Sequence, residues 1–228
     1  MDWVNRINEV IAYAENELPE EIDTVKISKI MGCPYPVFQR SFVQIMGITL
    51  QEYIEQRKSS NASLRVTQSV NIAQEINYRY IEKKAFKVIG KRKTTQAGGG
   101  GIWETAHEDG SIDQIMKIME MTEPAKPFLG LSFGFGGDRS EEGMIGIEYD
   151  GGDIEGLESY SCPESSWLIF TDEGKPNGKI FHKMREKIYS DFLPQSEYKQ
   201  SDLPTIETCT EWDTKNNFCK LEVWIPVY

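Results

Sequence analysis

The order of strand-like and helix-like segments over residues 80–228 is the feature that most limits what this chain can fold into. A β-α-β-β pattern begins at AFKVIGKRKTT, continues through a helical stretch, and ends in a hairpin of FLGLSFGF and GMIGIEYD. The same pattern recurs as SSWLIFTDEG, the helix KIFHKMREKIYSDFL, and the strands PTIETCTEW and FCKLEVWIPV. Neither unit can bury both faces of its sheet alone. We therefore expect an α+β fold whose two units pack face to face, with antiparallel sheets around a central cleft that forms the default ligand site.

Residues 1–65 have a helical period instead and predict a separate small module, with residues 66–79 as the linker. Apolar residues share one face over 3–17, over a second helix that Asp23 caps and Gly32 stops, and over a third helix at 35–46. In the helical stretch of the first β-α-β-β unit, Ser111 and Gln114 have the spacing of a capping box, which predicts a helix start there.

Composition and charge narrow the functional classes. The chain has 228 residues, of which 39% are hydrophobic and 27% charged, as in soluble globular proteins. No segment approaches the roughly 20 apolar residues of a membrane span, so we expect a cytoplasmic protein without membrane contact. The net charge of −11 works against phosphate backbones and favours cations. The four cysteines form no C-x-x-C pair, and the two histidines have no partners at ligand spacing, so we predict no metal site and no cofactor.

The segment EEIDTVKISKIMGCPYPVFQRSF resembles the first helix-turn-helix of AraC-type transcription regulators, and GITLQEYIEQRK resembles their linker helix. The resemblance implies that the third helix is a recognition helix, with Tyr35, Gln39 and Arg40 placed to reach DNA. The chain then departs from the pattern, because only TQSVNIAQEINYRY remains where a second helix-turn-helix belongs. Residues 1–65 also carry seven basic and nine acidic side chains, a net charge of −2 that is unusual for a DNA reader. A packing or homodimerisation element is therefore favoured over DNA binding by this chain alone.

The segments EKKAFKVIG, SCPESSWLIFTDEG, KIYSDFLPQSEYKQSDLPTIETC and LEVWIPV are together similar to GyrI-like effector-binding domains. The resemblance covers residues 80–228. It implies a ligand-binding domain of the kind found in multidrug-responsive and AraC-type activators, in free-standing proteins, and in some hydrolases of cyclopropane-containing toxins.

The same resemblance implies a buried, ligand-facing glutamate on the last strand, which corresponds to Glu222 in LEVWIPV. Strand alternation places Trp224 on the same face as Glu222, with Leu221 and Val223 on the other face. A solvated face rarely carries a tryptophan, so this face is expected to line a cleft. The alternative is an ordinary exposed glutamate beside an edge tryptophan.

A carboxylate in an aromatic pocket needs a compensating positive charge, and a hydrophobic cationic small molecule would supply it. The candidate aromatic walls are Trp103, Tyr149, Trp167 and Trp224, although each of these could instead be a core residue. The leading hypothesis is a ligand sensor of the transcription-regulator type. The second is a hydrolase in which Glu222 activates water and Tyr149 assists. The third, a DNA-binding activator, is weakened by the missing second helix-turn-helix.

Overall fold

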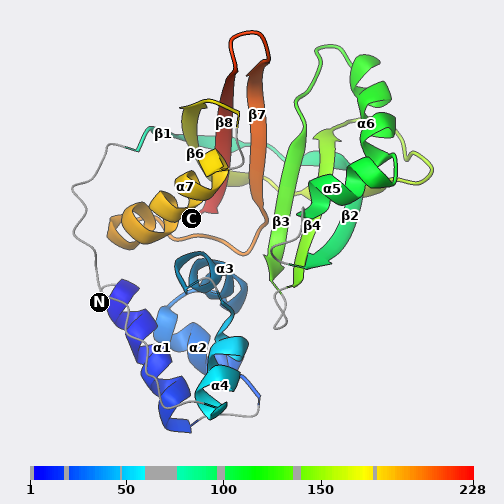
Figure 1. Ribbon diagram of the computed structural model, residues 1–228. Helices are drawn as coiled ribbons and strands as arrows, with labels where there is room; N and C mark the ends of the chain where they lie inside the picture. The colour runs from blue at the N-terminus through cyan, green and yellow to red at the C-terminus, as the bar shows by residue number, and fades with distance from the viewer. Residues whose placement is uncertain are drawn as a thin grey trace.

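The computed structural model describes residues 3–17, 21–46, 48–59, 76–96, 101–135, 140–176 and 179–228. Four helices form an N-terminal module, and an eight-stranded antiparallel sheet with helices against it forms the rest of the molecule (Figure 1). The predicted α+β fold class is confirmed. Among the residues described, no helix combines the length and apolar character needed to cross a membrane.

The helices of the N-terminal module share one apolar core. They are α1 (Trp3–Glu17), α2 (Thr24–Met31), α3 (Tyr35–Met46) and α4 (Leu50–Ser59). The Asp23 side chain caps α2 by accepting the backbone N–H of Lys26, and Gly32 ends the helix at a φ of 68°. Phe38 and Phe42 of α3 are fully buried against α1 and α4. The predicted helices at 3–17, 23–31 and 35–46 are thus confirmed.

The sheet has the strand order β1-β6-β8-β7-β3-β4-β2-β5. Its strands are β1 (Tyr78–Lys83), β2 (Phe86–Gln96), β3 (Leu129–Phe135), β4 (Ser140–Glu148), β5 (Glu158–Cys162), β6 (Ser165–Gly174), β7 (Thr205–Asp213) and β8 (Phe218–Val227). The helices between them are α5 (Gly101–Glu108), α6 (Ser111–Glu120) and α7 (Lys179–Lys187). A π-helical turn (Ile188–Phe192) and a 3-10 turn (Leu193–Gln195) extend α7.

The two β-α-β-β units are β2-α5-α6-β3-β4 and β6-α7-β7-β8, as predicted. They meet edge to edge through the pairing of β3 with β7, whereas we expected two sheets packed face to face. Pairing these edges satisfies backbone groups that each unit alone would leave open. The strands that precede the units are exchanged: β1 precedes the first unit but pairs with β6, and β5 precedes the second but pairs with β2.

Each unit covers one face of its strands with its own helix. Leu221, Val223 and Ile225 of β8 lie in the cluster with α7, and Ile89 and Ile145 lie in the cluster with α5 and α6. The opposite face of both units, which we call the inner face, shares a third cluster, made of Phe86, Val88, Leu129, Leu131, Met144, Cys162, Trp167, Ile169 and Ile206. The ring centroids of Phe86 and Trp167 are 6.4 Å apart although β2 and β6 lie near opposite ends of the sheet, so the sheet curls around this cluster.

The start of α6 differs from the prediction. Ser111 is the first helical residue and not a side-chain cap, and Gly110 precedes it with a φ of 74°. The carboxylate of Asp109 accepts hydrogen bonds from the backbone N–H and the hydroxyl of Ser111, and it pairs with Lys93 at 2.7 Å. The predicted capping box of Ser111 and Gln114 is therefore absent, and Asp109 accepts the backbone N–H of the first helical residue.

Candidate functional site

Glu222 lies within β8 with 6% of its surface exposed. Its neighbours Leu221 and Val223 pack against α7, so Glu222 points to the inner face, where Trp224 packs on the third cluster. The cross-strand partners of Glu222 are Thr171 of β6 and Thr208 of β7. Strand alternation predicted this arrangement of the two faces of β8.

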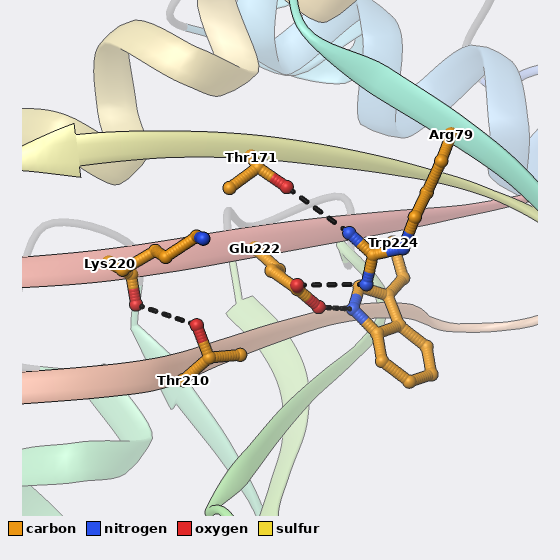
Figure 2. Close-up of polar contacts among 6 residues, drawn as sticks. All are labelled: Arg79, Thr171, Thr210, Lys220, Glu222 and Trp224. Carbon is orange, nitrogen blue, oxygen red and sulfur yellow. Dashed lines mark hydrogen bonds and ion pairs between the residues drawn. The ribbon is translucent and has the colours of Figure 1, made fainter.

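Both carboxylate oxygens of Glu222 accept a hydrogen bond (Figure 2). The Trp224 Nε1–H donates to Oε2 at 2.8 Å, and Nη2 of Arg79 donates to Oε1 at 2.9 Å. Nη1 of Arg79 lies 3.3 Å from the Thr171 hydroxyl oxygen. The Glu222 side chain is 8% exposed, whereas the Arg79 side chain is 51% exposed. A nearly buried carboxylate is thus compensated by a guanidinium that reaches in from the edge strand β1.

The strand pair that carries Glu222 is irregular beside the site. The β7–β8 register shifts between Cys209 and Glu211, and the hydroxyl of Thr210 donates to the carbonyl oxygen of Lys220 at 3.3 Å (Figure 2). A bulge of this kind increases the local twist of the strand. The bulge therefore shifts the pairing by one residue next to Leu221, and the ladder continues from Glu211 and Lys220 to Asp213 and Phe218.

Two of the predicted aromatic walls lie together on the inner face. Trp167 and Trp224 form an edge-to-face pair with ring centroids 6.0 Å apart. Trp167 is fully buried, and its Nε1–H has no hydrogen-bond acceptor among the described residues. A buried donor without a partner costs about 1 to 3 kcal/mol.

Of the other two aromatic candidates, Tyr149 is not brought to Glu222. Tyr149 follows β4 and packs in the cluster with α5 and α6, on the face opposite to the inner face. Trp103 belongs to α5, and its side chain lies outside the described residues. The hydrolase hypothesis therefore loses the tyrosine that it paired with Glu222.

Arg40, a predicted DNA contact, lies instead between the helical module and the rest of the molecule. Its side chain is among the largest fully buried ones, with 2% of the residue exposed. Nη1 donates to the carbonyl oxygens of Leu203 at 3.1 Å and Ser132 at 3.3 Å, and Nη2 donates to that of Ser201 at 3.4 Å. Burial lowers the pKa of the guanidinium. Helix α3 thus turns Arg40 toward the sheet domain because three carbonyl acceptors lie there.

Tyr35 and Gln39, the other two predicted DNA contacts, do not form an exposed surface with Arg40. Arg40 is buried, and both of them are partly buried. The Tyr35 ring packs beside Phe38 with centroids 5.9 Å apart, and burial raises the pKa of its hydroxyl to about 12. Gln39 is half-buried. Within the described ranges, no three potential metal-ligating side chains lie together.

Arg79 is the main residue that sequence patterns missed. It lies 143 positions from Glu222, and β1 carries mostly exposed residues that give no alternating signal. The only available sign was the position of YRYIEK next to a predicted strand. Thr171 was missed for the same reason, since its role depends on Arg79.

Solved structures with a similar fold cover the sheet domain. The structure of SAV2435 bound to tetraphenylphosphonium has a TM-score of 0.54 and 20% identity, covering 67% of this chain and 94% of that chain. A putative bacterial transcription regulation protein from Staphylococcus aureus MU50 has a TM-score of 0.53 and 19% identity, covering 67% and 99%. The EcmrR C-terminal domain has a TM-score of 0.50 and 13% identity, covering 67% and 98%. At these identities the likeness shows the fold.

Sequence comparison gives the family. No curated protein matches the chain significantly. The GyrI-like small molecule binding domain matches residues 76–228, which is well over half of the chain. The chain therefore belongs to the GyrI-like small-molecule binding family.

Proposed function

We propose that this GyrI-like domain is the sensor of a transcription-regulator-type protein and binds a hydrophobic cation on its inner face, against Glu222. The observation that carries the proposal is the Arg79–Glu222 ion pair at 2.9 Å, in which a nearly buried carboxylate is matched by a half-exposed guanidinium. Arg79 then marks the position that the positive charge of a ligand takes.

Exchange of Arg79 for a ligand cation is favourable for three reasons. The Arg79 side chain is half-exposed and regains water as it leaves, while the ligand cation takes over the pairing of the nearly buried Glu222 carboxylate. A large organic cation loses less hydration on burial than a compact ammonium ion. Trp224, which already contacts Glu222, adds a cation–π attraction of about 0.5 to 2 kcal/mol. Tetraphenylphosphonium, bound in the structure of SAV2435, is a cation of this kind.

The helical module, residues 1–65, is proposed to be an AraC-type remnant that packs on the sensor. Its third helix contacts β3, α7 and the π-helical turn, and Arg40 is enclosed in that contact. In this arrangement Arg40 does not face DNA. The proposal keeps Tyr35 and Gln39 as DNA contacts. It also includes a homodimer and a cytoplasmic location.

Calorimetric titration with tetraphenylphosphonium and with uncharged triphenylphosphine oxide tests the proposed function. We expect a dissociation constant of about 1 to 100 µM for the cation and binding at least about tenfold weaker for the neutral compound. Chromatography should recover the cation unchanged. Equal affinity for both compounds would contradict a charge-selective site, and recovery of altered ligand would favour the hydrolase hypothesis.

A further inference from the structure

A cavity of about 180 Å³ lies where the helical module meets the sensor domain. Met31 and Val37 line it from α2 and α3, and Leu193 and Gln200 line it from the segment that follows α7. None of the residues of the cation site lines this cavity. It is therefore a separate space, and a ligand bound there is independent of the proposed cation.

The cavity contains a buried polar group that lacks a partner. Gln200 is 5% exposed, and its Nε2 lies 3.2 Å from the Tyr189 hydroxyl oxygen. Its Oε1 has no hydrogen-bond partner among the described residues. Turning the amide over would exchange the two ends and still leave one of them unpaired, because Tyr189 lies at only one end. Gln200 thus keeps one unpaired end of its amide, which is buried within the wall of the cavity.

The charged side chains that line the cavity are basic. Arg6 and Lys199 contribute to its wall, and no aspartate or glutamate of the described residues does. Nη1 of Arg6 donates to the Met31 carbonyl oxygen, and a side chain on Gly32 would occupy the place of this guanidinium. In a chain of net charge −11, such a wall is a local positive site that favours an anion.

The cavity has room for one aromatic ring. A cavity of about 150 Å³ with an apolar lining holds benzene. Here Met31, Val37 and Leu193 supply an apolar wall beside the basic and amide groups. We propose that this junction binds a monocyclic aromatic carboxylate, with the ring against the apolar wall and the carboxylate toward Arg6 and Lys199.

Binding at this junction is linked to the position of α3. The residues that follow Gln200 include Ser201 and Leu203, whose carbonyl oxygens hold Arg40. A ligand that contacts Gln200 and the helical module together binds only when the two are docked. Occupancy therefore stabilises docking by mass action.

Titration of the full chain with benzoate tests the site. We expect a dissociation constant of about 0.1 to 1 mM, which suits a ligand of this size, and binding about fivefold or more weaker for benzyl alcohol, which has the ring without the charge. Lys199→Gln should weaken benzoate about two- to fivefold, because it removes one exposed charge at the wall. Lys175→Gln, which removes an exposed charge elsewhere, should leave the affinity unchanged.

Thiol labelling locates the bound benzoate without any variant. Cys33 lines the cavity, and burial raises the pKa of its thiol to about 11. Cys209 is similarly half-buried but lies on β7. Benzoate should slow the reaction of Cys33 with N-ethylmaleimide at mildly alkaline pH and leave that of Cys209 unchanged, as followed by mass spectrometry. Absence of saturable binding, or binding without protection of Cys33, would overturn the proposal.

Discussion

Glu222 accepts one hydrogen bond from Trp224 and one from Arg79, and these two donors differ in how easily they can leave. Trp224 sits two residues along the same strand and packs on the inner-face cluster. Arg79 extends from the edge strand β1, with half of its side chain in solvent. A ligand can therefore displace Arg79 from Glu222 far more easily than it can displace Trp224.

Arg79→Gln is expected to tighten tetraphenylphosphonium binding by about two- to fivefold. The ligand then no longer has to displace the Arg79 guanidinium from the Glu222 carboxylate. Tryptophan fluorescence titration measures the change. Lys84→Gln is the matched control, because it removes one positive charge from an exposed pair with Glu164 and should change nothing. Unchanged or weaker binding by the Arg79 variant would contradict the exchange.

Sequence patterns predicted some site residues and could not predict others. Alternation along LEVWIPV identified the face of Glu222 and Trp224, since the side-chain direction in a strand is a local property. The Arg79 contact joins strands far apart in the chain, and no local rule reports it. Arg40 was assigned to DNA by resemblance, whereas its acceptors lie more than 90 positions away.

Helix α3 is the element that fastens the module to the sensor domain. Arg40 donates to carbonyl oxygens of β3 and of the segment before β7, so one side chain connects three parts of the structure. Charged hydrogen bonds of this kind contribute about 1.5 to 3 kcal/mol. The docking of α3 should therefore depend on this one guanidinium.

Arg40→Met should release the module from the sheet domain, because methionine keeps much of the apolar stem but donates no hydrogen bond. We expect amide hydrogen exchange in residues 200–204 and in α3 to rise by about tenfold or more. Lys29→Met, an exposed change on α2, should have no effect. If protection persists without Arg40, other contacts hold the module.

Strands β2 and β4 approach each other closely at two glycines. Gly90 and Gly146 are directly opposite in the register, and a side chain on Gly90 would lie 2.0 Å from the carbonyl oxygen of Ile145. Gly90→Ala should therefore lower the free energy of unfolding by about 2 to 4 kcal/mol, as measured by urea denaturation. Gly152→Ala has open space around it and should cost less than about 1 kcal/mol. A fully stable Gly90 variant would show that the strands can separate there.

The elements that sequence patterns missed are the two edge strands. β1 is mostly exposed, and β5 has one buried residue, so neither shows the apolar alternation that marks a strand. The six other strands and the helices α1 to α3 carry strong periodic signals and were predicted. The exchange of β1 and β5 between units depends on tertiary pairing and has no local signature.

For the whole molecule, β1 links the proposed cation site to the helical module along the chain. β1 is the first strand after the module in the sequence, yet it pairs with the second unit and carries Arg79. A ligand that displaces Arg79 therefore acts on β1, the strand that follows the helical module in the sequence. We therefore expect displacement of Arg79 by the proposed ligand to change amide hydrogen exchange in β1.

Titration of wild type and Glu222→Gln with tetraphenylphosphonium decides whether the buried carboxylate holds the ligand. Glutamine has almost the same size as glutamate, so circular dichroism should show an unchanged fold while the charge of the site is lost. We predict a loss of affinity of about 30-fold or more, because the cation then lacks its buried counter-ion. Equal affinity in the two proteins would show that Glu222 does not hold the ligand, and the proposed site would be wrong.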